Sequence, residues 1–539
     1  MTQHRPPYHE HEEFQNRSRK LNELNALNIN SYPHTFHYSH TAKTLDDLYA
    51  NEPIGHSEEA EKETTPQVSV SGRLVLFRAM GKNAFAHIQD HTGRVQVMFN
   101  RDHTKLHGYQ GEEISAFKII EKKFDLGDII GVQGHLFRTQ KGELTLYAKE
   151  VTLLCKTLLP LADKHSGLHD KELRFRERWL DLISNPDVAS TFRKRSQIVS
   201  QVRQMLEKKG FIEVETPVLQ SIYGGAEARP FTTLLNALHQ EMFLRISLEI
   251  PLKKLIVGGM HRVFEIGRVF RNEGIDRNHN PEFTMMEAYA AYWDYNDMMK
   301  LVEELFESCA LLLYGDTKIP ASLPTDTGEP KEIFIDLKAP WKRLSMKEAI
   351  LHYGKIDVDA LSTEELRKML LDSGHCAPKK LAALSRGLLI AATFEVFAEP
   401  HLIEPHHIID HPIETTPLCK PHRDPKLNVE GLVERFESFI LGQEICNAYT
   451  ELNDPVIQRH LLELQADRRE SGDEEAAPLD EEFIKSICQG MPPTGGVGIG
   501  IDRMMMILLN QYSIRDVLYF PWMKPQQEQE EDDAPIEAL

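Results

Sequence analysis

The chain has 539 residues, of which 41% are hydrophobic and 27% charged, and its net charge at pH 7 is −20. This length exceeds what one hydrophobic core supports, so we expect several domains. No apolar run approaches the roughly 20 residues that span a bilayer, the N-terminus lacks an apolar signal region, and the six cysteines form no C-x-x-C pair. These features argue against a membrane or secreted protein and predict a cytoplasmic one without disulfides or a zinc site.

The first 158 residues divide into two parts. Residues 1–66 are polar, and their apolar side chains at 14, 21, 24 and 27 have the spacing of a surface helix. Residues 67–158 alternate as short strands, with hairpin signals at 91–93 and 140–142 and a helix-like piece at 112–123. Five strands with one helix fit a Greek-key barrel of the OB type.

This predicted barrel is the basic part of an acidic chain. Residues 68–160 hold 13 Lys and Arg against nine Asp and Glu. OB barrels bind single-stranded nucleic acid by stacking bases on aromatic rings over a basic surface. Phe77 and Phe85 either stack on bases or fill the barrel core, and spacing alone leaves both readings open; Arg78, Lys82 and Gln96 would supply polar contacts.

A charged connector, residues 159–185, leads into a large domain that we place at 186–524. Residues 363–398 form a prominent helical stretch within it. The acidic tail, residues 525–539, is expected to be disordered.

Three segments of the large domain carry chemistry. Arg271 and Arg503 each follow an apolar strand with carboxylates nearby, an arrangement that suits a nucleoside triphosphate. Residues 283, 285, 287 and 289 are spaced by two, so a strand would place them on one face, with Phe283 as an aromatic platform and Glu287 and Tyr289 deeper in the same groove. Gly496, Gly498 and Gly500 leave one face of another strand bare.

Residues 435–454 read as a hairpin with a three-residue loop at 441–443. This loop would pair Glu437 with Asn447 and put Asn447, Tyr449 and Glu451 on one face. Glu444 is three residues from Asn447, so in a regular strand it would point to the opposite face. A β-bulge would be needed to bring Glu437 and Glu444 to one ion.

These segments resemble class II aminoacyl-tRNA synthetases, and the full set is similar to the lysyl-tRNA synthetase family. Residues 209–219 resemble motif 1, 263–289 motif 2 and 496–503 motif 3, and residues 315–435 look like an insertion between motifs 2 and 3. The resemblance covers residues 68–524. It implies an α+β protein: an N-terminal OB-fold barrel and a catalytic domain built on an antiparallel sheet flanked by helices. Motif 1 lies at the two-fold interface in this class, which implies a homodimer.

The resemblance also implies roles for individual residues in catalysis and in binding ATP. Arg271, as the α-phosphate clamp, and Arg503, on the γ-phosphate, would be catalytic, and Phe283 would stack on adenine. Further ATP contacts would come from Glu273, His279, Asn280 and Glu444. Glu437 and Glu444 would hold Mg²⁺, a metal that prefers oxygen ligands. Bacterial members carry Arg where this chain has Asn278, so a γ-phosphate contact from that position is not implied.

For the amino acid, the resemblance implies L-lysine. The lysine-binding residues would be Gly225, Glu249, Arg271, Glu287, Tyr289, Asn447, Tyr449 and Glu451. The related aspartate enzymes use a lysine and an arginine at the positions of Leu252 and Glu451. A pocket holding Glu249, Glu287 and Glu451 favours a substrate with a second ammonium group, because buried acids need a counter-ion.

The implied reaction forms lysyl-adenylate from ATP and then transfers lysine to the 3′ end of tRNA(Lys). By the same resemblance, Arg78, Phe85, Gln96 and Glu143 would contact the anticodon. Three alternatives remain. An aspartate or asparagine enzyme is disfavoured by Leu252 and Glu451. A protein lysyl-transferase would lack the barrel, and a non-enzymatic RNA-binding paralogue would have no need of Arg271 and Arg503.

Overall fold

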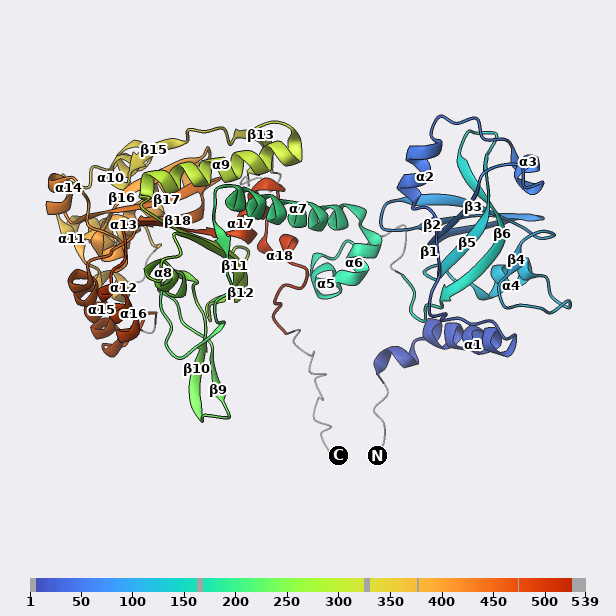
Figure 1. Cartoon of the computed structure of the whole chain (residues 1–539), viewed down its shortest axis with the longest axis horizontal. Coiled ribbons are helices and arrows are strands. Elements are labelled where there is room, and N and C mark those ends of the chain that lie inside the picture. The colour runs from blue at the N-terminus through green and yellow to red at the C-terminus, as the bar shows by residue number, and fades with distance from the viewer. Residues whose placement is uncertain (1–5, 162–167, 324–329, 376–377, 474, 526–539) are drawn as a thin grey trace, which may run out of the picture. The chain divides into compact units, whose positions relative to one another are not determined.

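The structure is a computed structural model that describes residues 6–161, 168–323, 330–375, 378–473 and 475–525. The chain forms two compact units, Met1–His169 and Asp170–Leu539 (Figure 1). Nearly all of the predicted tail lies outside the described residues. None of the helices in the described ranges is both long and apolar enough to cross a membrane.

The first unit is a closed barrel preceded by short helices. Its elements are η1 (Pro7–Glu10), α1 (Glu12–Ala26), α2 (Ala42–Tyr49), α3 (Ser57–Glu61), β1 (Gln67–Met80), β2 (Asn83–Gln89), β3 (Arg94–Asn100), β4 (Lys105–Leu106), α4 (Ala116–Lys123), β5 (Ile129–Arg138) and β6 (Leu144–Cys155). The strands are ordered β3-β2-β1-β5-β6-β4, and a parallel β3–β6 pairing closes the barrel. Alternate residues of β2 point inward, as Ala84, Ala86 and Ile88 do. This is the OB-type barrel that the alternation predicts.

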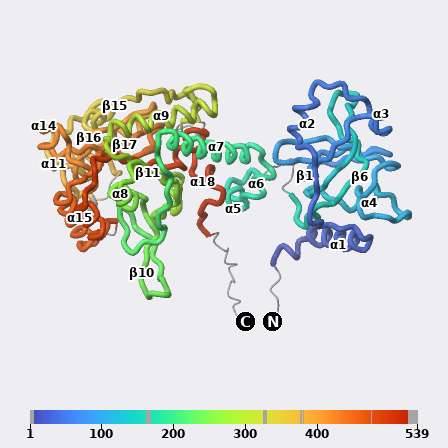
Figure 2. Tube along the Cα trace, in the orientation of Figure 1, coloured from blue at the N-terminus to red at the C-terminus, as the bar shows by residue number. Residues whose placement is uncertain are grey.

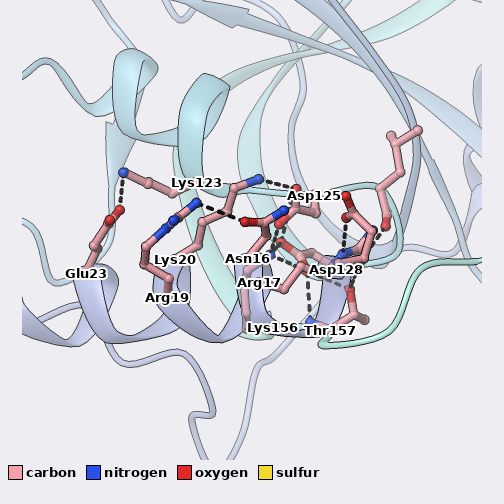
Figure 3. Close-up of polar contacts among 12 residues, drawn as sticks. Asn16, Arg17, Arg19, Lys20, Glu23, Lys123, Asp125, Asp128, Lys156 and Thr157 are labelled. Carbon is pink, nitrogen blue, oxygen red and sulfur yellow. Dashed lines mark hydrogen bonds and ion pairs between the residues drawn. The ribbon is translucent and has the colours of Figure 1, made fainter. Parts of the chain in front are cut away.

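Helix α1 is fastened to the barrel by a polar network (Figure 3). Lys156 is buried, and its Nζ lies 2.5 Å from Asp125 and 2.9 Å from Asp128. Lys20 of α1 shares Asp125 at 2.5 Å, and Arg17 donates a hydrogen bond of 2.8 Å to Thr157. The buried ammonium is therefore paired with two carboxylates, which offsets the cost of removing it from water.

The second unit is built on an eight-stranded sheet ordered β15-β16-β17-β18-β19-β12-β11-β7. Most neighbours in the sheet are antiparallel, and β7–β11 and β15–β16 are parallel pairs. The strands of this sheet are β7 (Ile212–Glu213), β11 (Arg262–Phe270), β12 (Glu282–Ala291), β15 (Lys342–Ser345), β16 (His406–Pro412), β17 (Leu432–Ile440), β18 (Gln443–Thr450) and β19 (Thr494–Gly500). Strands β15 and β16 therefore join residues 315–435 to the main sheet.

Two small sheets lie beside the main one. The first contains β8 (Leu219–Gln220), β9 (Thr232–Leu235) and β10 (Gln240–Leu244), and the second pairs β13 (Lys318–Leu323) with β14 (Lys331–Asp336). The β9–β10 hairpin extends away from the body of its unit (Figure 2).

The helices of the second unit begin in the predicted connector. They are α5 (Lys171–Arg176), α6 (Arg178–Ser184), α7 (Pro186–Lys208), α8 (Glu249–Val257), α9 (Tyr295–Tyr314), α10 (Met346–Ala349), η2 (Ile350–Gly354), α11 (Thr363–Asp372), α12 (Pro378–Ala383), α13 (Arg386–Phe397), η3 (Glu399–His401), η4 (Ile413–Thr415), α14 (Pro425–Val429), α15 (Pro455–Glu470), α16 (Glu481–Cys488), α17 (Ile501–Leu508) and α18 (Ile514–Val517). The helical stretch expected at 363–398 is thus divided into three helices.

The two faces of the main sheet are covered differently. Met286, Ala288 and Ala290 of β12 pack into the large core that contains α7, α9 and α17. The intervening residues face the opposite side, where Phe283, Met285 and Tyr289 meet α8 and α16. This second side is less completely filled, and it carries the cavity described next.

Candidate active site

A single cavity of about 490 Å³ gathers every site residue predicted in the large domain. These residues come from the segments at β11–β12, the β17–β18 hairpin, α8, α17 and the loop that contains Gly225, which are far apart in the sequence. The cavity is lined by Gly225, Glu249, Arg271, Glu273, His279, Asn280, Phe283, Glu287, Tyr289, Glu437, Glu444, Asn447, Tyr449, Glu451 and Arg503.

Strands β12 and β19 form the floor of the cavity. Glu287 pairs with Gly498 and Tyr289 with Gly496 across the ladder. A Cβ atom at Gly496 would overlap both Glu451 and Tyr289. The glycines predict a strand face without side chains. At Gly496, the side chains of Glu451 and Tyr289 occupy that space.

One end of the cavity is a buried acidic cluster of Glu249, Glu287 and Glu451. Glu287 accepts hydrogen bonds from the backbone N–H of Leu248 at 2.8 Å and from the hydroxyl groups of Ser247 at 3.1 Å and Tyr289 at 3.0 Å. Burial, with the nearby charge of Glu249, raises the pKa of Glu287 to about 7.

The third acid, Glu451, is 1% exposed. Burial raises its pKa to about 8. Its Oε2 contacts the ammonium group of Lys253, and its Oε1 has no hydrogen-bond partner. A buried carboxylate in this state is costly, so the site is suited to a cationic ligand.

The other end of the cavity carries two arginines, Arg271 and Arg503, beside the acids Glu437 and Glu444. The guanidinium of Arg271 lies 5.2 Å from the ring centroid of Phe283. Arg503 donates hydrogen bonds to the backbone oxygen of Glu444 at 2.7 Å and to its carboxylate at 3.3 Å, and it lies 3.5 Å from His279. Two arginines beside an aromatic platform suit the phosphates and the base of a nucleotide.

Glu437 and Glu444 approach each other through the β17–β18 hairpin. Glu437 pairs with Asn447, as predicted, and a register shift between Ser438 and Phe439 supplies the expected bulge. The predicted three-residue loop is wrong: Ile440 pairs with Gln443 around a two-residue turn. Leu441 and Gly442 have φ values of 55° and 66°, which are typical of a type I′ turn.

This acid pair fits a magnesium ion that also binds phosphate. Burial and the charge of Glu437 raise the pKa of Glu444, so a cation there would relieve the repulsion. Among the described residues, no three His, Cys, Asp or Glu side chains form a metal-binding group. Two carboxylates without a complete protein cage are what Mg²⁺ uses when a substrate phosphate completes its coordination.

Two residues of the site were not predicted. Lys253 is fully buried between Glu249 and Glu451, and the spacing of four between Glu249 and Lys253 on a helix is the signal that could have identified it. Arg435 contacts Glu437 and lies 3.1 Å from the amide oxygen of Asn447. It precedes Glu437 by two residues and thus shares its strand face.

On the barrel, the structure brings together the four predicted contact residues. Arg78 and Phe85 are directly opposite each other on β1 and β2, and Gln96 of β3 accepts a hydrogen bond of 2.7 Å from Thr145. His87, unpredicted, lies on the same face as Phe85 and 3.3 Å from Glu143.

Phe77 occupies a different environment from Phe85. It stacks on Phe99 of the barrel core, with ring centroids 5.9 Å apart. Phe85 packs on the other side of the sheet, against the cluster of Met98, Phe137 and Tyr147. Core packing therefore accounts for Phe77, and Phe85 lies on the face that carries the polar side chains.

Comparison with known proteins agrees with this architecture. Residues 170–524 match the family described as class II tRNA synthetases (D, K and N), and residues 68–154 match an OB-fold nucleic acid binding domain of the tRNA anticodon type. The fold and the first match, which covers more than half of the chain, define a class II aminoacyl-tRNA synthetase and confirm the predicted fold class.

Relatives of similar length identify the family within this class of synthetases. A lysine–tRNA ligase of Chlamydia pneumoniae is 54% identical over 96% of this chain and 98% of that protein. Lysine–tRNA ligases of Methanoculleus marisnigri and Nostoc punctiforme are 46% and 44% identical, over 94% and 95% of this chain and 94% and 87% of those proteins. The chain belongs to the lysine–tRNA ligase family, which confirms the resemblance seen in its motifs.

Proposed function

We propose that this protein uses ATP to activate L-lysine as lysyl-adenylate and transfers the lysine to the 3′ end of tRNA(Lys). The observation that carries this proposal is the polarity of the cavity. Buried acids stand at one end, and Arg271 and Arg503 stand at the other. A lysine with its two ammonium groups among the acids would direct its carboxylate toward the arginines.

Lysine recognition depends on Glu249, Glu287 and Glu451. Their carboxylates would accept hydrogen bonds from the two ammonium groups, with Gly225 adding a backbone contact. Tyr289 and Tyr449 would pack along the aliphatic part of lysine. Asn447 and Arg271 would hold its carboxylate.

In the first step, an oxygen of the lysine carboxylate attacks the α-phosphorus of ATP, and the bond to the β-phosphate breaks to release pyrophosphate. A carboxylate is already ionised, so this attack needs no general base. Catalysis then consists of positioning and charge neutralisation. Arg271 would bind the α-phosphate and Arg503 the γ-phosphate, while Phe283 would stack on adenine with further contacts from Glu273, His279 and Asn280.

Glu437 and Glu444 would hold Mg²⁺, which supplies positive charge to the phosphates when it is bound. In the second step, the terminal ribose hydroxyl of tRNA attacks the lysyl carbonyl and AMP leaves. Arg78, Phe85, Gln96 and Glu143 would read the anticodon from the barrel.

We also propose that the protein works as a homodimer in the cytoplasm, where tRNA is charged for protein synthesis. The dimer is supported by three apolar side chains in and next to β7 and β8. Ile212, Val218 and Leu219 are 54%, 39% and 46% exposed in the single chain. Burying them against a second copy would remove this apolar surface from water.

Transfer of radiolabelled lysine to tRNA tests the whole proposal. Purified protein with ATP and Mg²⁺ should charge a total tRNA preparation with lysine and with no other amino acid. Lack of lysine transfer under conditions where the protein is folded would contradict it.

A further inference from the structure

Lys253 is a buried ammonium group that the proposed reaction does not use. It lies on α8, and its side chain is 0% exposed. Its Nζ lies 2.5 Å from Glu249 Oε1, contacts Glu451 Oε2, and is 5.9 Å from the ring centroid of Phe483. A lysine is rarely this buried unless it is paired.

The position of Lys253 relative to the cavity indicates its role in the site. Glu249 and Glu451 both line the cavity, whereas Lys253 does not. Its ammonium therefore lies behind the two carboxylates, with the ring of Phe483 beside it. If the side chain of Lys253 took the place of the substrate, its ammonium group would lie inside the cavity.

The charges of the cluster balance only when Lys253 is counted. Glu249, Glu287 and Glu451 carry three negative charges when ionised. The two ammonium groups of a bound lysine would neutralise two of them, and Lys253 neutralises the third. Without Lys253, one buried carboxylate would lack a counter-ion, which is strongly unfavourable.

We infer that Lys253 is a positioning residue that binds one oxygen each of Glu249 and Glu451 from behind, leaving the other oxygens for the ammonium groups of the substrate. This inference rests on the proposed function. By this inference, the site always contains one cation of its own. A substrate with one ammonium group therefore leaves the acidic cluster with an excess negative charge, whereas a substrate with two ammonium groups balances the charge of the cluster.

The groups that respond to Lys253 are known from the packing around it. They are Glu249 on α8, Glu451 after β18 and the thiol of Cys419, whose backbone forms a β-bridge with that of Glu451; beyond them lie Glu287 and Tyr289 of β12 and Tyr449 of β18. Although burial lowers it, the charges of Glu249 and Glu451 raise the pKa of Lys253 above its ordinary value. Removing this cation should raise the pKa of both acids.

The test is lysine-dependent pyrophosphate exchange, measured against lysine concentration and pH, in Lys253→Met and the wild type. At pH 7 the variant should have a lysine KM at least about tenfold higher, and the acidic limb of kcat/KM for lysine should move upward by about one pH unit. The KM for ATP should stay within about twofold. A variant with an unchanged lysine KM and an unchanged limb would overturn the inference.

Lys254→Met is the matched control. Lys254 is the next residue on the helix, is partly exposed, and pairs with Glu482 at 3.1 Å. This variant should behave as the wild type. A purely structural role for Lys253 would lower stability or kcat without moving the pH limb, and that result would also count against the inference. Lack of exchange with lysine in the wild type would instead remove the proposed function itself.

If Lys253→Met does not fold, a crystal structure of the wild type with bound lysine decides the matter. The Lys253 ammonium should remain between Glu249 and Glu451 in the complex. Its replacement there by an ammonium group of the substrate would show that it is a displaceable stand-in, and would overturn the inference.

Discussion

At the scale of single residues, the site depends on charges held where water cannot screen them. Arg271 is one example, because it lines the cavity and its guanidinium lies over the ring of Phe283. In a site closed to water, such a guanidinium is worth far more to a developing phosphate charge than it would be in solution.

Replacing Arg271 should therefore stop activation without unfolding the protein. We expect Arg271→Ala to lower lysine-dependent pyrophosphate exchange by at least about 10²-fold, the usual cost of one preorganised donor. Arg268→Ala is the control, because Arg268 lies near the end of β11, three residues before Arg271, is exposed, and pairs with Glu282 at 3.5 Å outside the cavity lining. Normal exchange in Arg271→Ala would refute the role assigned to this residue.

The acidic cluster predicts a pH dependence. Burial raises the pKa of Glu287 to about 7 and that of Glu451 to about 8. Lysine binds their ionised forms, so its dissociation constant should fall as pH rises from 6 to 9, and binding at pH 7 should release protons. Calorimetry in buffers of different ionisation enthalpy measures this release.

The same raised pKa values make the ligand-free protein less stable as pH rises, although they favour lysine binding at high pH. Groups whose folded pKa is raised stabilise the fold at low pH and lose that contribution as pH rises through 7 and 8. The lysine-induced rise in Tm should therefore be larger at pH 8.5 than at pH 6. Equal rises at both values would mean that the acids do not titrate in this range.

At the scale of elements, β19 leaves room for the acidic cluster because it has no side chain at Gly496. Gly496 is required because a side chain there would overlap Glu451 and Tyr289. Gly496→Ala should displace Glu451 and raise the lysine KM by about tenfold or more, since overpacking a filled site costs about 1–3 kcal/mol. Gly500→Ala on the same strand meets atoms at 3.8 Å or beyond and should have a much smaller effect.

Much of this arrangement could be predicted from periodicity. The two-residue spacing of β12 put Phe283, Glu287 and Tyr289 on one face, and parity showed that Glu444 needs a bulge to join Glu437. The hairpin loop could not be predicted, because its turn requires Leu441 at positive φ, a conformation that leucine rarely adopts. The spacing of four could have indicated the pairing of Lys253 with Glu249, but the contact of Lys253 with Glu451 depends on which strands approach α8, and no local pattern shows that.

At the scale of the molecule, the recognition of the tRNA anticodon and the activation of lysine that we propose belong to separate compact units. The two activities should therefore respond to different substitutions. Phe85→Ala should raise the KM for tRNA in the charging reaction by about tenfold, since stacking contributes about 1–3 kcal/mol per base. It should leave pyrophosphate exchange unchanged. An equal loss in both assays would mean that Phe85 supports the fold instead.

Assembly can be tested in the same way. Leu219→Glu places a charge on β8, among the exposed apolar side chains assigned to the interface, and should convert the proposed dimer to monomers in sedimentation velocity experiments. Leu371→Glu on α11 is the control, because Leu371 is 44% exposed and Leu219 is 46% exposed. A dimer that survives Leu219→Glu would place the interface elsewhere.

The central claim is that a cavity with acids at one end and arginines at the other selects lysine for activation. Amino-acid-dependent exchange of pyrophosphate into ATP, measured for the purified protein with each of the twenty amino acids, tests it most directly. We expect strong exchange with lysine and none above background with aspartate or asparagine. Exchange driven by aspartate or asparagine in place of lysine would contradict it.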